Sequence, residues 1–157
     1  MDDNVKIITG HTAQQWVIFP ELHQGYCDLM REFHGDTFFI KKDQFSALLR
    51  ARTELIVFAL AGQKILATAQ ATLVQTPPIF QVMFSNVVVA QGSQKNGVGR
   101  ALVEYLETCA KAQWGKDRSL RIFLTNAPSK QNGAFYEKLD FTPRIDDRAT
   151  VVWEKIV

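Results

Sequence analysis

Residues 87–102 read VVVAQGSQKNGVGRAL, an apolar run that breaks into a glycine-rich turn and continues as an amphipathic pattern. The run 87–90 is β-branched and apolar enough for a buried strand. From Val98 onward, apolar residues recur at the three- and four-residue spacing of a helix face. The stretch therefore predicts a strand, a glycine loop and a helix, with Gly97 and Gly99 at the helix entrance.

A helix that begins at this loop predicts an anion-binding site. Its first backbone N–H groups and the positive end of its dipole point into the space beyond the strand. Because Gly97 and Gly99 have no Cβ, an anionic group can approach the main chain closely. Lys95 and Arg100 add positive charge nearby.

The spacing of the loop separates the known phosphate-binding patterns. A nucleotide P-loop requires Gly-Lys-Ser/Thr, and Gly99 is followed instead by Arg100 and Ala101. A dinucleotide fingerprint requires a small residue where Leu102 stands and an acidic residue after the next strand, which ends in Leu-Thr-Asn at 124–126. Neither pattern fits, and an ordinary strand-to-helix turn stays open as an alternative.

The composition describes a single globular domain over residues 1–157, with 46% hydrophobic and 22% charged residues. No apolar stretch approaches the ~18 residues of a membrane span, and the chain starts with acidic residues, so we expect a cytoplasmic protein without a membrane partner. The net charge of +2 comes from dispersed basic residues, which argues against a nucleic-acid surface. Cys27 and Cys109 give little support to a disulfide framework or a metal site.

Hydrophobic periodicity predicts a mixed order of strands and helices. A helix between two strands requires a crossover, so the strand at 120–124 is expected to run parallel to the strand before the loop. An aromatic segment at 36–40 is expected either to line a pocket or to pack. The predicted elements are a strand at 5–8, a helical hairpin of 12–16 (capped by Thr12) and 21–32, a helix at 43–49, a β-hairpin of 54–60 and 65–74, a strand at 79–90, a helix at 98–112, a strand at 120–124, a helix at 129–139, and strands at 141–144 and 150–156.

The pattern Gln94-x-x-Gly97-x-Gly99 resembles the Gln/Arg-x-x-Gly-x-Gly/Ala signature of the GNAT N-acetyltransferase superfamily. The order of elements is similar to the GNAT fold as well. Residues 129–141 resemble the late motif of the family, Asn-x-x-Ala-x-x-Phe/Leu-Tyr-x-Lys-x-Gly-Phe, except that Ser129 and Asp140 replace its asparagine and glycine. The resemblance implies an α/β (α+β) fold, in which helices flank a central mixed, mostly antiparallel sheet with one splayed parallel pair of strands.

The resemblance also implies a set of site residues, with acetyl-coenzyme A as co-substrate and no metal. Backbone groups of the fourth strand would pair with the pantetheine arm, and the glycine loop would hold the pyrophosphate. Tyr136, at the family's tyrosine position, would protonate the departing thiolate, which is reasonable chemistry for a phenol within hydrogen-bond reach. The implied cofactor-binding residues are Val87, Val88, Val89, Gln94, Lys95, Asn96, Gly97, Val98, Gly99, Arg100 and Asn132.

The implied activity is transfer of an acetyl group to a primary amine by direct attack in a ternary complex. The identity of the general base stays open, because residues 80–90 contain no Asp, Glu or His. Ser85 and Asn86 could only orient a water, and Glu32, His34 and Asp36 are alternative bases or substrate ligands.

Two further alternatives stay open. A domain of the same fold could bind an acyl-coenzyme A as a sensor without turning it over. A homodimer could form if an exposed terminal strand at 151–156 paired with a second copy.

Overall fold

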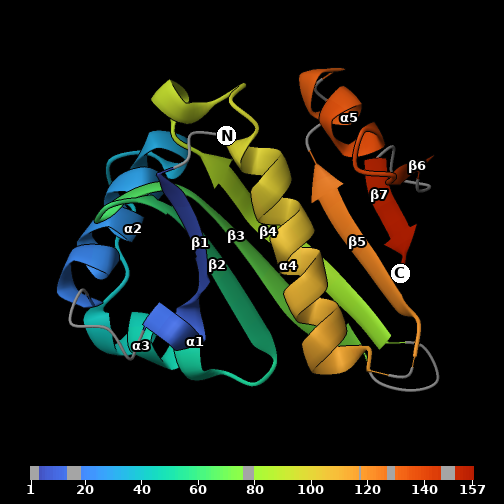
Figure 1. Ribbon diagram of the computed structural model, residues 1–157, viewed down its shortest axis with the longest axis horizontal. Coiled ribbons are helices and arrows are strands. Elements are labelled where there is room, and N and C mark those ends of the chain that lie inside the picture. The colour runs from blue at the N-terminus through green and yellow to red at the C-terminus, as the bar shows by residue number, and fades with distance from the viewer. Residues whose placement is uncertain (1–3, 14–18, 76–79, 117, 127–129, 146–150) are drawn as a thin grey trace.

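The computed structural model describes residues 4–13, 19–75, 80–116, 118–126, 130–145 and 151–157. Within them, the strands form one mixed sheet in the order β1-β2-β3-β4-β5-β7-β6 (Figure 1). The elements are β1 (Val5–Thr9), α1 (Gly10–Ala13), α2 (Phe19–His34), α3 (Lys42–Arg50), β2 (Glu54–Ala61), β3 (Lys64–Gln75), β4 (Phe80–Val89), the 3₁₀ turn η1 (Gln91–Ser93), α4 (Val98–Trp114), β5 (Leu120–Asn126), α5 (Lys130–Glu137), β6 (Thr142–Ile145) and β7 (Val151–Ile156).

The sheet is antiparallel except between β4 and β5, where the chain crosses over through α4. The parallel ladder runs only from Phe80 and Leu120 to Met83 and Phe123. Beyond it the two strands diverge, and the gap between them opens beside the beginning of α4 (Figure 1). The predicted fold class, a mixed sheet with a splayed parallel pair, is confirmed.

Alternation along β2 places two hydrophobic cores on opposite faces of the sheet. Val57 and its neighbours two residues away pack with buried residues of α4 such as Leu102 and Leu106. Phe58 points to the other face and packs with Tyr26 of α2 and Phe45 of α3. Each fully buried side chain of this kind contributes about 2 kcal/mol by leaving water, so α4 is fixed rigidly to the sheet next to the glycine loop.

Two sequence predictions about local structure are wrong. The N-terminal helix is capped by Thr9 rather than Thr12, because the Thr9 hydroxyl accepts the backbone N–H of Thr12 at 3.2 Å. The predicted continuation to Trp16 lies outside the described residues. The strand at 151–156 is not a free edge either, because β7 lies between β5 and β6.

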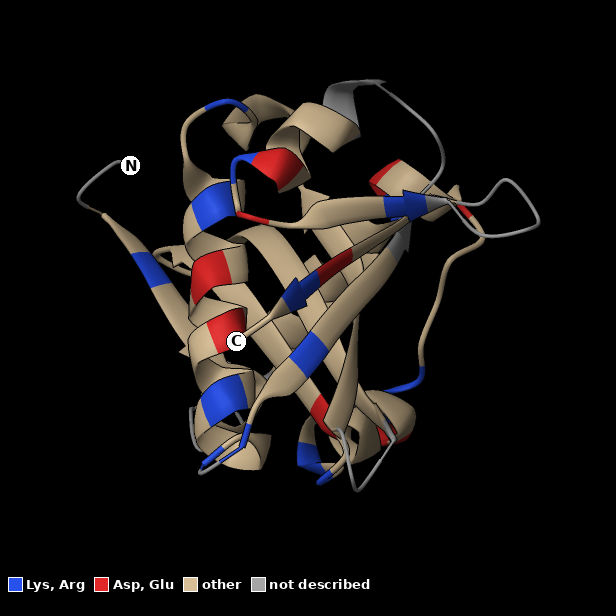
Figure 2. Cartoon of the chain, turned by 90° about the vertical axis from the view of Figure 1, so that its right-hand side faces the viewer, with Lys and Arg blue, Asp and Glu red and all other residues tan. Residues whose placement is uncertain are grey.

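The sheet end formed by β5, β7 and β6 is joined by ion pairs. Glu154, which is buried, accepts hydrogen bonds from Arg121 at 2.6 and 3.1 Å and also pairs with Arg144. Lys155 donates to Glu107 of α4 and to the Leu139 carbonyl after α5, at 3.0 and 3.1 Å. Figure 2 shows acidic and basic positions interspersed on this side of the molecule. These contacts hold α5 at a fixed place relative to α4.

Among the described helices, none is both long enough and apolar enough to span a bilayer.

Candidate active site

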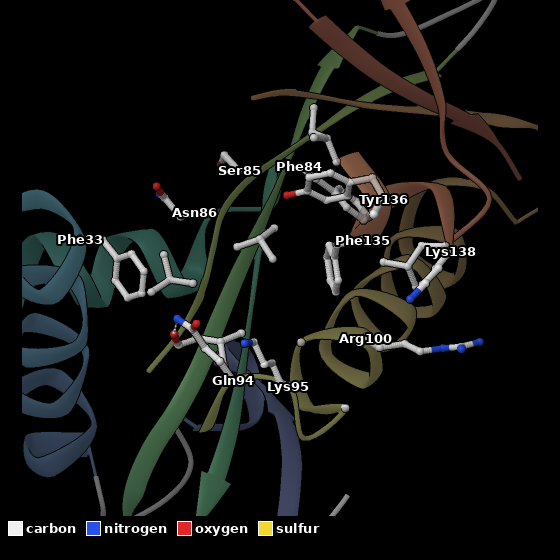
Figure 3. Close-up of a pocket in the computed structure, with 18 of the residues that line it drawn as sticks. Phe33, Phe84, Ser85, Asn86, Gln94, Lys95, Arg100, Phe135, Tyr136 and Lys138 are labelled. Atoms are coloured by element: carbon white, nitrogen blue, oxygen red, sulfur yellow. Dashed lines mark hydrogen bonds between the residues drawn. The ribbon is translucent and has the colours of Figure 1, made fainter. Parts of the chain in front are cut away.

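A cavity of about 1150 Å³ lies where β4 and β5 diverge. Its walls are the second half of β4, the loop and first turn of α4, the helix α5 and the end of α2. Figure 3 shows side chains from these four parts of the chain around one space. The predicted glycine loop and the predicted tyrosine therefore open onto the same cavity.

A β-bulge shapes the β4 wall. The ladder with β3 shifts between the pairs Thr68–Val88 and Gln70–Ser85, so β4 has one extra residue there. Asn86 adopts a left-handed φ of 49°, which asparagine tolerates better than most residues. Because the parallel ladder with β5 stops at Met83, the backbone edge of β4 beyond it is not paired with β5.

The glycine loop lines the cavity beside the beginning of α4. Gly97 has a left-handed φ of 80° and precedes α4, whose first hydrogen bond runs from the Ala101 N–H to the Gly97 carbonyl at 3.0 Å. The earlier N–H groups have no acceptor within the helix. An added Cβ on Gly99 would lie 3.2 Å from Val89 and 3.6 Å from Phe135, so the glycine permits close packing of the loop against β4 and α5.

The polar side chains of the loop have different roles. Gln94 donates its side-chain N–H to the Val89 carbonyl at 3.1 Å and so joins the loop to the end of β4. Lys95 lies at the cavity, whereas the Arg100 side chain points away from it (Figure 3). The Arg100 guanidinium donates to Glu104 at 2.8 Å, so Arg100 can serve an anion in the cavity only through its backbone N–H.

Tyr136 is held by the way α5 ends. The Phe141 N–H bonds to the Tyr136 carbonyl at 3.1 Å and the Asp140 N–H to the Glu137 carbonyl at 3.0 Å, which is a Schellman cap. The left-handed residue of this cap is Asp140, with φ 64°. The position therefore requires the conformation that glycine adopts most easily, and aspartate takes the glycine's place without changing the cap.

The ring of Tyr136 is packed and its hydroxyl is directed into the cavity. The ring centroids of Phe135, Phe141 and Trp153 lie 5.1, 6.0 and 6.0 Å from the centroid of the Tyr136 ring. Figure 3 shows the hydroxyl pointing toward β4, where Ser85 lies. Burial raises the pKa of Tyr136, which keeps the phenol protonated at neutral pH and able to donate.

The structure brings most of the predicted site residues to this cavity, but not all. Asn96 and Val98 are not among the lining residues, and the Val98 side chain is buried in the core under α4. The side chain of Asn132 lies outside the described part of the chain. The predicted residues that line the cavity are Val87, Val88, Val89, Gln94, Lys95, Gly97, Gly99, Arg100 and Tyr136.

The alternatives for base or substrate ligand separate in the structure. His34 lines the cavity, whereas Glu32 accepts the Gln91 N–H at 3.4 Å and Asp36 does not line it. None of the residues 36–40 lines the cavity. The pocket role for this aromatic segment is therefore wrong, because Phe38 packs on Tyr26 and His34 instead.

Sequence reasoning gave no site role to several lining residues, among them Phe33 and Lys138. Phe33, at the end of α2, is 43% exposed and lines the cavity. Lys138 was part of the recognised motif without a role, and it lines the same cavity as the loop (Figure 3). Its position two residues after Tyr136 was the available signal. Within the described residues, no group of three or more His, Cys, Asp or Glu could hold a metal ion.

Comparisons with known proteins agree with this architecture. A model of the acetyltransferase (GNAT) domain matches residues 52–143. No match is found among curated proteins. An acetyltransferase from Streptococcus agalactiae 2603 superposes with a TM-score of 0.71 at 17% identity, over 99% of both chains.

Two further solved structures share the fold. Glucosamine-6-phosphate N-acetyltransferase from Arabidopsis thaliana has a TM-score of 0.68 at 18% identity, over 90% of this chain and 94% of that chain. A PaiA N-acetyltransferase from Thermoplasma acidophilum, in complex with coenzyme A, has a TM-score of 0.66 at 12% identity, over 98% of this chain and 99% of that chain. At such identities the likeness shows the fold, whereas the domain model covers more than half of the sequence. The chain belongs to the GNAT acetyltransferases, a family that carries out acyl-coenzyme A-dependent acetyl transfer.

Proposed function

We propose that this protein is an acetyl-coenzyme A-dependent N-acetyltransferase that acetylates a primary amine by direct attack in a ternary complex. One observation carries the proposal. A single cavity joins the free N–H groups at the beginning of α4, the unpaired edge of β4 and the hydroxyl of Tyr136. These are an anion site, a row of backbone hydrogen-bonding groups and a proton donor.

The cavity fits acetyl-coenzyme A by its chemistry. The N–H groups of residues 97–100 suit a pyrophosphate, with Lys95 and Lys138 adding positive charge. The amides of Val87 and Val89 on the free edge of β4 suit the pantetheine arm. Gln94 supports the loop through its bond to the Val89 carbonyl, and the Val98 N–H is one of the loop amides. Asn96 and Asn132 complete the proposed set.

In the proposed reaction, the amine nitrogen attacks the acetyl carbonyl carbon and the C–S bond breaks. Tyr136 gives its proton to the departing thiolate and regains one from solvent. The amine loses its proton to a water held near Ser85 and Asn86. No covalent acyl-enzyme forms, and the products are the amide and free coenzyme A.

Calorimetric titration with acetyl-coenzyme A tests the cofactor site. We expect binding by the parent protein and loss of binding in Gly97→Glu, which places a carboxylate in the loop. Gly62→Glu is the matched control, because Gly62 also has a positive φ, 61°, and equally open surroundings, but lies in the turn between β2 and β3. Absence of binding by the parent would overturn the proposal.

Release of the coenzyme A thiol, followed with a disulfide dye across a panel of primary amines, tests turnover. We expect amine-dependent release by the parent. Binding without release for any amine would favour the sensor alternative over the enzyme.

A further inference from the structure

A line of hydrogen-bonded polar side chains crosses the sheet and ends at the cavity wall. The Asn86 amide N–H donates to Gln70 Oε1 at 3.1 Å, and the Gln70 amide N–H donates to Glu54 Oε2 at 2.8 Å. The Thr72 hydroxyl donates to the same carboxylate oxygen, also at 2.8 Å. The line starts on β2, passes through β3 and reaches the bulge of β4.

The direction of these hydrogen bonds is determined at Glu54. A carboxylate oxygen that receives two hydrogen bonds acts as an acceptor, so Gln70 must turn its NH₂ group toward Glu54. The Gln70 carbonyl oxygen then faces Asn86, which must turn its own NH₂ group toward Gln70. The Asn86 carbonyl oxygen is left on the other side of the amide.

That oxygen belongs to a residue that lines the cavity, whereas Gln70 does not line it. Among the described residues no hydrogen-bond donor to Asn86 Oδ1 is found. Within the described part of the chain, the cavity wall therefore presents an acceptor at Asn86 that has no donor and is oriented by a carboxylate two strands away. An N–H donor, such as the amino group of an acceptor substrate, complements this oxygen.

The charges around the cavity limit which other charged groups the acceptor molecule can carry. Lys95 and Lys138 are charged lining residues, whereas the Arg100 side chain points away and pairs with Glu104; none of the described lining residues is Asp or Glu. Among these described lining residues, a polycationic acceptor meets no carboxylate that could pair with its additional ammonium groups. The cavity is also lined by Phe33, an exposed ring that suits an apolar body and attracts a single cation.

Resting on the function proposed above, we propose that the acceptor is a monoamine with an apolar body, whose amino group is bound by Asn86 Oδ1. Phe33 receives the apolar body. Gln70 and Glu54 are positioning residues that keep the Asn86 oxygen turned toward the substrate.

Substrate choice gives the first test. We expect kcat/KM for 2-phenylethylamine to exceed that for spermidine by about tenfold or more, because additional positive charge is unpaired in this cavity. A preference for spermidine would overturn the monoamine assignment. Absence of transfer to every amine would overturn the proposed function together with this inference.

Asn86→Gly gives the second test, because glycine keeps the left-handed backbone and removes only the amide. We expect the KM for 2-phenylethylamine to rise about tenfold or more, the loss of one hydrogen bond to a charged donor. The KM for acetyl-coenzyme A should stay within about twofold, because the substitution removes no group that is proposed to bind this substrate. An unchanged amine KM with normal turnover would refute the role of Asn86 and leave the acetyltransferase proposal standing.

Glu54→Gln tests the role of Glu54. The variant allows the Gln70 amide to turn its carbonyl toward residue 54, so Asn86 is no longer held with its oxygen toward the substrate. We expect the KM for 2-phenylethylamine to rise and the KM for acetyl-coenzyme A to stay within about twofold. Glu21→Gln, which removes a carboxylate from the exposed first turn of α2, is the control and should leave both KM values unchanged. An unchanged amine KM in Glu54→Gln would refute the positioning role.

Discussion

Replacement of Tyr136 by phenylalanine separates the proposed chemistry from the packing around it. The substitution removes one hydroxyl and keeps the ring, which touches Phe135, Phe141 and Trp153. Because the aromatic contacts remain, the thermal midpoint and the affinity for acetyl-coenzyme A should change little. The hydroxyl points into the cavity, so its loss should act on the transfer step.

The size of the effect follows from the acidity of the phenol. General acid catalysis typically contributes about 10²–10⁴-fold. Burial raises the pKa of Tyr136 above that of a free tyrosine, and a thiolate resembling that of cysteine has a pKa of about 8.5, so the proton transfer is uphill. We therefore expect the low end of the range, a fall in kcat of about a hundredfold.

The assay is steady-state release of coenzyme A with the amine and acetyl-coenzyme A varied in turn. Tyr105→Phe is the matched control, because Tyr105 lies on α4, is only half-buried and does not line the cavity. The raised pKa adds a pH signature: activity that depends on protonated Tyr136 persists through neutral pH and is lost only as pH rises above 10. A kcat of Tyr136→Phe within about twofold of the parent would refute the acid role.

Three further predictions concern stability. Burial raises the pKa of Tyr26 to about 12 from 10.0, so the folded state favours the neutral phenol. About 3 kcal/mol of stability that is present below pH 10 should therefore be lost as pH rises to 12. Denaturant titrations over this pH range should show a smaller loss of stability in Tyr26→Phe than in the parent. Asp140→Ala should lower the free energy of unfolding by about 1 kcal/mol relative to Asp140→Gly, a difference in thermal midpoint of about 2–4 °C by calorimetry, because alanine tolerates φ 64° poorly. Glu154→Gln should cost about 2 kcal/mol in urea unfolding by leaving the Arg121 charge unpaired, whereas Glu104→Gln, in an exposed pair, should cost less than about 0.5 kcal/mol. Each prediction compares two proteins: the parent with Tyr26→Phe, Asp140→Ala with Asp140→Gly, and Glu154→Gln with Glu104→Gln. An equal loss of stability in both members of a pair would contradict the argument for that pair.

Local patterns were sufficient to predict the elements around the glycine loop. The β-branched run before the loop, Gly97 at its left-handed position and the apolar spacing from Val98 all act within a few residues of one another. The parallel relation of β4 and β5 followed from the helix between them. The late motif placed Tyr136 on a short helix, and the recognised departure at Asp140 is the left-handed residue that ends it.

Features that depend on contacts distant in sequence were not predictable in this way. The bulge at Asn86 is a shift of register between β3 and β4, and no local pattern in β4 encodes it. The line from Glu54 to Asn86 requires that residues 54, 70 and 86 share one face of the sheet. The interior place of β7 depends on β6 pairing outside it, so an exposed terminal strand stayed open as an alternative until the sheet order was known. Thr9 and Thr12 offer the same hydroxyl chemistry, and only the observed helix start distinguishes them.

Backbone strain supplies an independent argument for where this molecule acts. Among the described residues, the non-glycine positions with positive φ are Asn86, Lys95 and Asp140. Asn86 and Lys95 line the cavity, and Asp140 ends the helix that holds Tyr136. Left-handed conformations cost free energy for residues with a Cβ and persist where the surrounding structure imposes them, most often at functional sites. All three therefore converge on the cavity that the glycine loop predicts, although the φ angles and the loop pattern are separate observations.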